Sequence, residues 1–254
     1  MPKNRHGQGA VAWTGGRIDE LIGREGNMSL SDPRIARLQE EVRAAEEDFE
    51  LAVMFHETWK PAACDKGLHH RLRNSRAAQT FGVVRAALRR EMLMALMRLW
   101  DGRPDGASME FIAETLRDRN IINALAEDRA ARSDAAEGAE SLMRRDLNRL
   151  ADEAIALIEK YSSGGSHVAL REKLSAASSS TLPPQQSAAL AGAEAETDDI
   201  CAFYQDNLTL IRLLLGLARA VHYDPEDAAK LHRLNATSFW GEVRGERRRT
   251  LAGF

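Results

Sequence analysis

Residues 33–59 read PRIARLQEEVRAAEEDFELAVMFHETW, and this stretch decides the fold class. Its apolar side chains recur at spacings of three and four residues, which is the repeat of an amphipathic helix. The members of this stripe are Ile35, Leu38, Val42, Ala45, Phe49 and Ala52. Asp32 and Pro33 predict the helix start, because aspartate caps free amide groups and proline fits the first helical position. The opposite face is acidic, and Pro61 is predicted to end the helix.

The rest of the chain is also helical in pattern. Ala, Leu, Arg and Glu dominate, aromatic residues make up only 6%, and alternating β-branched runs are almost absent, so no strand is predicted. Further helices are predicted over residues 69–100, 108–116, 120–131, 134–161, from 166 or 167 onwards, 197–221 and 225–240. The helix over 197–221 is apolar on most sides, so we expect it to be deeply buried. The predicted fold is an all-α, multi-helix bundle.

Composition also suggests the domain organisation. Residues 1–27 are rich in glycine and lack a sustained period, so a poorly ordered N-terminal extension is expected. The alternative is a short docking arm around Trp13. Residues 28–254 are expected to form a single domain, although the length would also suit two small ones. Serines and prolines near residues 177–188 predict a loop within it.

Charge and cysteine content narrow the class of protein. The formal net charge is −3, so any nucleic acid would have to bind at a local basic patch. Cys64 and Cys201 are the only cysteines, and we expect free thiols in a reducing, cytoplasmic setting. No apolar run approaches the ~18 residues of a membrane-spanning helix, so no membrane span is predicted.

The histidines do not predict a metal site. His56, Cys64, His69 and His70 are the candidate zinc ligands. The first two flank a proline-containing loop, and the two adjacent histidines point to different faces of a helix. Neither spacing matches a familiar zinc finger. We expect neither a metal nor another cofactor.

The stretch LREKLSAAS at residues 170–178 holds an arginine and a polar residue but no histidine. It resembles the motif of the HEPN superfamily of small, α-helical and often RNA-cutting domains, in which a histidine follows the arginine near a helix end. Three other segments, in the same order along the chain, resemble the abortive-infection U-type branch of that superfamily. They are the helix that ends in ALMRLWD at 95–101, the short helix at 108–116, and ATSFW at 236–240.

The resemblance implies a symmetric dimer in which paired motifs form a metal-independent endoribonuclease site. The motif histidine would help the ribose 2′-hydroxyl attack its own phosphate. Carried onto this chain, Arg171 takes the phosphate-facing role and Glu172 a polar orienting role. Ala176 and Ala177 occupy the positions where the histidine is expected, and alanine cannot move a proton. The interpretation is a degenerate member that binds RNA or a nucleotide, with cutting in doubt.

Other groups near the motif are weak replacements for the histidine. Lys173 would be a poor base unless burial lowered its pKa, and Ser178 has no local activating base. His167 lies one helical turn before Arg171 on the same face, which reverses the motif order. His222 is better placed to cap a helix end.

The basic residues Arg73, Arg76 and Arg90 are predicted to lie along one side of a helix and, with Lys173, to bind nucleic acid. The alternative is a solvated face that pairs with the acidic first helix. Arg171 has a similar alternative, an ion pair with a glutamate of the preceding helix, Glu153 or Glu159.

The leading hypothesis is a HEPN-like protein of a phage-defence or toxin–antitoxin system. Its expected partners are a second copy, RNA or a nucleotide, and an antitoxin or nucleotidyltransferase. The apolar helix over 197–221 and Trp240 also need cover, which favours dimerisation. The alternative hypothesis is a structural helical protein that dimerises or binds other proteins and has no nucleic-acid function.

Overall fold

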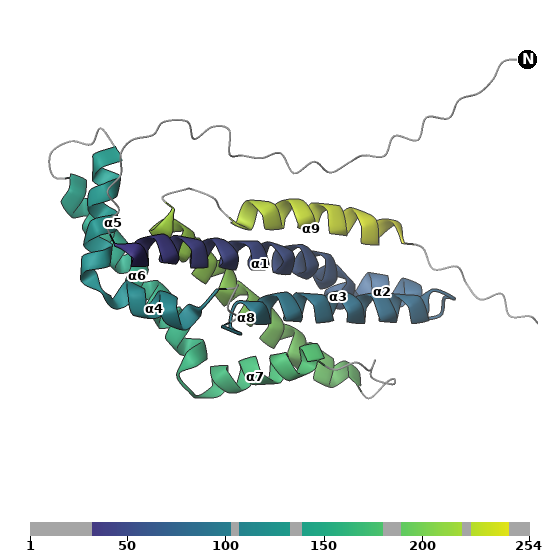
Figure 1. Ribbon diagram of the computed structural model, residues 1–254. Coiled ribbons are helices and arrows are strands. Elements are labelled where there is room, and N and C mark those ends of the chain that lie inside the picture. Colours follow the sequence, from purple (N-terminus) through teal and green to yellow (C-terminus); the bar gives the residue numbers. More distant parts are fainter. Residues whose placement is uncertain (1–31, 103–106, 133–138, 180–188, 220–224, 244–254) are drawn as a thin grey trace, which may run out of the picture. The chain divides into compact units, whose positions relative to one another are not determined.

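The computed structural model describes residues 32–102, 107–132, 139–179, 189–219 and 225–243. These ranges contain nine helices and no strand (Figure 1), which confirms the predicted all-α fold. The helices are α1 (Pro33–Cys64), α2 (Lys66–Leu72), α3 (Ala78–Arg98), α4 (Met109–Arg117), α5 (Arg119–Arg132), α6 (Ala139–Ser162), α7 (Ser166–Ser179), α8 (Ala189–Ala218) and α9 (Pro225–Glu242). In the described part of the chain, no helix is long and apolar enough to cross a membrane. The predicted N-terminal extension, residues 1–27, lies outside the described residues.

Helix α1 begins as predicted but continues past its proline. The Asp32 side chain accepts a hydrogen bond from the Arg34 backbone amide at 2.9 Å, and the whole predicted apolar stripe is buried. Pro61 lies in the last turn, where it removes only one backbone hydrogen bond. Ala62, one residue later, is fully buried in a small cluster with Trp240 of α9. This burial offsets the missing bond, and the prediction that Pro61 ends the helix was wrong.

The helix predicted over residues 69–100 is two helices, α2 and α3, joined by a turn at residues 73–77. Ser75 is buried in that turn. Its backbone amide and its hydroxyl both donate to the Leu72 carbonyl, at 3.0 and 2.9 Å. A serine hydroxyl that bonds the nearby backbone in this way competes with continuation of a helix.

The boundaries around α7 and α8 also differ from the prediction. Gly164 and Gly165 adopt φ values of +85° and +89°, and this left-handed turn separates α6 from α7. Helix α7 then runs through Ser179, so residues 177–179 are helical and not part of the predicted loop. The remainder of that loop, residues 180–188, is outside the described ranges. Helix α8 begins at Ala189, eight residues before the predicted start at 197.

The core forms around α1, which packs against α3, α4, α8 and α9 (Figure 1). Helix α8 packs against α6 as well as α1. Most of its apolar residues after position 199 are buried, as predicted. Phe49 of α1 stacks on Tyr204 of α8 with ring centroids 5.7 Å apart. Helix α7, which carries Arg171, packs against α3 and α6. The candidate site therefore lies at the edge of this core, on the α3–α7 pair.

Candidate functional site

Arg171 lines a cleft of about 380 Å³ between the end of α3 and one face of α7. The cleft residues are Met97, Trp100 and Asp101 from the end of α3 and the turn after it, and Arg171, Glu172, Ser175 and Ala176 from α7. The two predicted motif residues, Arg171 and Glu172, thus line the same cleft. Trp100 and Asp101 were not predicted as site residues, although both lie in the segment at 95–101 that resembles the superfamily.

The Arg171 guanidinium lies over an aromatic ring. Its central carbon is 5.8 Å from the centroid of Trp100, within the range of a cation–π contact. Glu159 pairs with Arg117 at 2.7 Å, and Glu153 pairs with Arg149 at 2.8 Å. The structure therefore does not bear out the alternative that Arg171 pairs with one of these glutamates.

Trp100 is held by a network that fixes its ring as one wall of the cleft. Its indole N–H donates to Asn207 Oδ1 at 3.0 Å, and its ring centroid is 5.6 Å from that of Tyr161. The Tyr161 hydroxyl donates to Asp206 Oδ2 at 2.6 Å, and Lys160 donates to the same oxygen at 2.5 Å. Burial and the Asp206 carboxylate raise the pKa of Tyr161, so its hydroxyl stays protonated and keeps donating. The result is a rigid surface under Arg171.

The helical repeat of α7 decides which positions can act in the cleft. Ala176 lines the cleft, whereas Leu174 and Ser178 are buried on the side that faces the core. Ala177 is only partly buried and is not among the lining residues. A histidine at position 176 would face the cleft, and alanine there leaves the cleft without an imidazole on this helix.

The other candidates near the motif have different surroundings. Lys173 is exposed, and its ammonium lies 3.7 Å from a carboxylate oxygen of Asp199 on α8. The Ser178 hydroxyl donates to the Ser175 carbonyl of the same helix at 2.7 Å. His167 is exposed and meets the Tyr161 ring edge-on, with ring centroids 5.5 Å apart. None of these three residues lines the cleft, and His222 lies outside the described residues.

The predicted basic stripe is spread along α2 and α3. Arg73 and Arg76 are exposed at the turn between these helices. Arg90 lies further along α3, about 18 Å from its first residue at 1.5 Å per residue. Its Nε donates to the Ser178 carbonyl at 3.3 Å, near the end of α7. Arg90 therefore shares the α3–α7 surface with Arg171, while Arg73 and Arg76 lie at the opposite end of α3.

Acidic residues of α1 pair with arginines outside the predicted basic stripe. Glu46 binds Arg219 after α8, and Arg37 lies 3.3 Å from Glu41 on the same helix. These pairs use part of the acidic face that the alternative interpretation assigned to the basic stripe.

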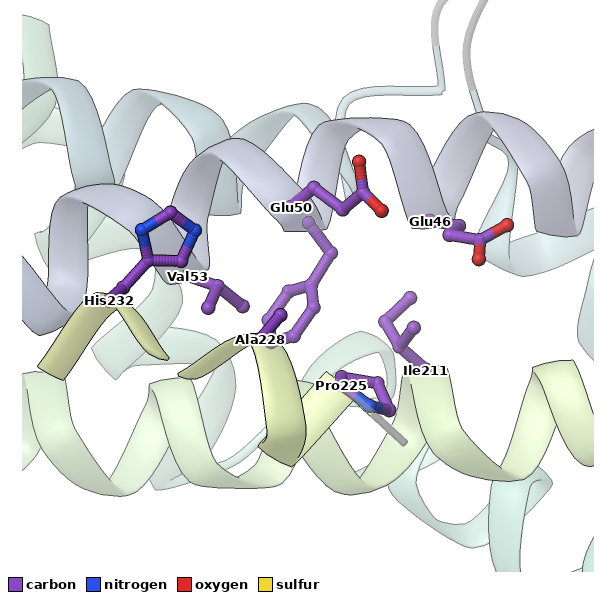
Figure 2. Close-up of a pocket in the computed structure, with 8 residues that line it drawn as sticks. Glu46, Glu50, Val53, Ile211, Pro225, Ala228 and His232 are labelled. Carbon is purple, nitrogen blue, oxygen red and sulfur yellow. The ribbon is translucent and has the colours of Figure 1, made fainter. Parts of the chain in front are cut away.

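A second, smaller hollow of about 200 Å³ lies between α1, α8 and α9, as Figure 2 shows. Its walls are mostly apolar, including Phe49, Val53 and Ile211, while Glu46 and His232 lie at the rim. Burial raises the pKa of Glu46, although the Arg219 guanidinium beside it favours its charged form. This hollow contains no residue of the motif.

The candidate zinc ligands are used in other ways. His56 is buried beside Glu57, and the His69 imidazole lies 2.7 Å from the Ala62 carbonyl oxygen. Within the described ranges, no group of three or more histidine, cysteine, aspartate or glutamate side chains is arranged to hold a metal ion.

A comparison with known protein families identifies the family of this chain. The family model described as AbiU2, of the HEPN type, matches residues 35–172, more than half of the chain. The chain belongs to the AbiU2 family. The match runs from α1 into α7 and ends one residue after Arg171, so it includes the cleft residues up to Glu172. Positions 176 and 177 and the segment at 236–240 fall beyond it. No curated protein and no solved structure shows significant similarity to the chain.

Proposed function

We propose that this AbiU2-family protein binds a phosphate of RNA or of a nucleotide at Arg171, in the cleft between α3 and α7. The observation that carries the proposal is the position of the guanidinium. It lines a hollow, lies over Trp100, and has no carboxylate within 4.0 Å among the residues that the structure describes. A guanidinium can bind two phosphate oxygens at once. Arg90, on the same pair of helices, supplies a second positive charge.

We infer that binding is not followed by histidine-driven cutting. In endoribonucleases of this kind a group with a pKa near neutrality moves the proton of the 2′-hydroxyl. The residues that line the cleft include two carboxylates, Asp101 and Glu172, and one hydroxyl, Ser175, but no histidine. The two carboxyl groups in the cleft also disfavour a bound phosphate, so we expect modest affinity.

Family membership supports a proposal for the biological role. An abortive-infection-type HEPN protein would act in phage defence or in a toxin–antitoxin pair, as a homodimer, with an antitoxin or a nucleotidyltransferase as a further partner. These are proposals that rest on family membership, and the cytoplasm is the compartment in which such a protein would meet its RNA.

The test is RNA binding measured by fluorescence anisotropy with a labelled single-stranded RNA in EDTA. Arg171→Ala is expected to weaken binding roughly tenfold or more, because a charge-assisted hydrogen bond contributes about 1.5–3 kcal/mol. Arg149→Ala is the matched control, since it removes one exposed arginine of α6 that pairs with Glu153. Equal affinities for the wild type and both variants would reject the site.

The same samples test the inference about cutting. Gel analysis of the RNA after incubation in EDTA is expected to show no cleavage above that of a blank. Cleavage by the wild type that disappears in Arg171→Ala would overturn the binding-only proposal while supporting the site itself.

A structural interaction protein is the second candidate, and the outer face of α9 favours it. Leu231, Leu234 and Phe239 are each more than half exposed on this helix, and exposed apolar groups of this size often mark protein contacts. This alternative expects no RNA affinity and no effect of charge changes at Arg73, Arg76 or Arg171. Loss of RNA binding in Arg171→Ala alone would reject it.

A further inference from the structure

A thiol, an imidazole and a carboxylate meet between α1 and α8, at residues that do not line the Arg171 cleft. The Cys201 sulfur lies 3.9 Å from His56 Nε2, and His56 Nδ1 lies 3.1 Å from Glu57 Oε1. His56 and Glu57 are both 1% exposed, whereas Cys201 is partly exposed. The order of the three groups is that of a nucleophile, its general base, and the group that orients the base.

Glu57 sets the tautomer of His56. Burial alone would raise the Glu57 pKa, but hydrogen bonds from His56 and Arg233 outweigh it and lower the pKa to about 2. An ionised carboxylate only accepts hydrogen bonds, so Nδ1 of the neutral imidazole must carry the hydrogen. The lone pair of Nε2 then faces the Cys201 sulfur.

Two contacts fix this arrangement. The Arg233 guanidinium of α9 donates to both Glu57 oxygens, at 2.7 and 3.3 Å. The His56 ring stacks on Tyr204 with centroids 3.6 Å apart, which holds the ring plane. The base is therefore oriented before any reagent arrives.

Cys201 and His56 are both uncharged at neutral pH. Burial raises the pKa of the Cys201 thiol and lowers the pKa of the His56 imidazole. The charged and titratable groups around the pair are Lys60, Cys64 and Glu57 of α1, Asp198 and Tyr204 of α8, and Arg233 of α9. Proton transfer must then accompany attack by sulfur, as with a serine nucleophile, because no thiolate is formed beforehand.

We propose that Cys201 is a modification site, a thiol that reacts with small uncharged oxidants such as hydrogen peroxide, with His56 as its general base. The sulfur attacks one peroxide oxygen, so the S–O bond forms as the O–O bond breaks. The thiol proton passes to His56 Nε2 and then to the departing hydroxide, which leaves as water. The sulfur is oxidised by two electrons to a sulfenic acid, and the peroxide is reduced. This site is independent of the proposed RNA cleft.

The chain contains its own control, because Cys64 is more exposed than Cys201 and the structure shows no histidine contact for it within the described residues. The experiment uses full-length Cys64→Ser, which retains only Cys201, and Cys201→Ser, which retains only Cys64. Alkylation by iodoacetamide is followed by intact mass from pH 6.5 to 8.5. Hydrogen peroxide, with dimedone to trap sulfenic acid, forms the second arm.

The pH dependence of the reaction rate distinguishes a thiol that has a general base from one that has none. A thiol that reacts only as its thiolate speeds up about tenfold per pH unit below its pKa, and Cys64 should do so. Cys201 should change less than about threefold over the whole range, because its neutral thiol and neutral base are present throughout. It should also react faster than Cys64 at pH 6.5 and collect the dimedone label first.

A variant without the His56 imidazole tests whether His56 is the base. His56→Asn in the Cys64→Ser background should restore the tenfold slope, with thermal melting used to check that the variant folds. If it does not fold, the two single-thiol profiles still decide. A tenfold slope for Cys201, or a Cys201 rate below that of Cys64 at pH 6.5, would overturn the proposal.

Discussion

The buried carboxylate of Glu57 gives the most quantitative prediction. Glu57→Gln keeps the size of the side chain but removes the charge that binds Arg233 and His56. A carboxyl whose pKa falls from 4.5 to about 2 on folding contributes on the order of 3 kcal/mol at neutral pH. We expect the variant to lose about that much free energy of unfolding in urea at pH 7, consistent with the cost of breaking a buried pair.

The pH dependence tests the cause of this loss. Because the folded-state pKa of Glu57 lies below that of the unfolded chain, its contribution is present above pH 4.5 and is lost as the pH falls towards 2. The difference between wild type and Glu57→Gln should shrink by about 1 kcal/mol between pH 7 and pH 4, and by about 2 kcal/mol by pH 3.

The control is Glu153→Gln, which breaks an exposed pair with Arg149 and should cost under about 0.5 kcal/mol. Two variants of equal stability at pH 7 would refute the reasoning. A difference that stays constant from pH 7 to pH 3 would show that packing, and not the charge of Glu57, is responsible.

Three further predictions concern the cleft and the turns. Glu172→Gln should tighten RNA binding up to about fivefold at low salt, because it removes a carboxylate that repels phosphate; weaker binding in the anisotropy assay would mean that its charge orients Arg171. Ser75→Ala should lower the free energy of unfolding by about 1 kcal/mol, since it removes the hydroxyl bond to Leu72, and an unchanged urea midpoint would count against that bond. Gly164→Ala should lower the free energy of unfolding by about 1 kcal/mol, because φ at this position is +85°. Gly82→Ala lies in the interior of α3 with open space around it and should raise the free energy of unfolding by up to about 1 kcal/mol. If thermal melts show the same sign for both variants, the backbone argument is wrong.

The helices could be predicted from the sequence where one periodic signal dominated. All six stripe residues of α1 are buried, from Ile35 to Ala52, because a single face of this helix meets the core. The break between α2 and α3 was not predicted because it depends on local hydrogen bonds that compete with those of a continuing helix. Apolar residues continue through Leu72, whereas the hydroxyl and amide of Ser75 both bond the Leu72 carbonyl and compete with continuation of the helix.

The end of α7 was misjudged for a tertiary reason. Residues 177–179 (Ala-Ser-Ser) were predicted to belong to the loop near 177–188, although alanine is a strong helix former. Leu174 and Ser178 are buried, and Arg90 of α3 donates to the Ser178 carbonyl at 3.3 Å. An arginine that binds a carbonyl near a helix end stabilises that end. The local sequence around Ser178 does not indicate this contact, because Arg90 is distant in the chain.

The candidate site was predictable in part. The motif identified Arg171 and Glu172, and both line the cleft. Trp100 approaches Arg171 only because α3 packs against α7, and its ring is set by Asn207 of α8. The contact between Cys201 and His56 spans 145 residues of chain. Contacts of this kind come from packing, and sequence spacing carries no signal for them.

The central claim, that Arg171 binds a nucleic-acid phosphate, is tested most directly by the salt dependence of RNA affinity. Each phosphate neutralised on a single strand contributes about 0.7 to the slope of log affinity against log salt concentration. Arg171→Ala should reduce the magnitude of this slope by about 0.7, while Arg149→Ala should leave it unchanged. A slope that is the same for the wild type and Arg171→Ala would contradict the claim.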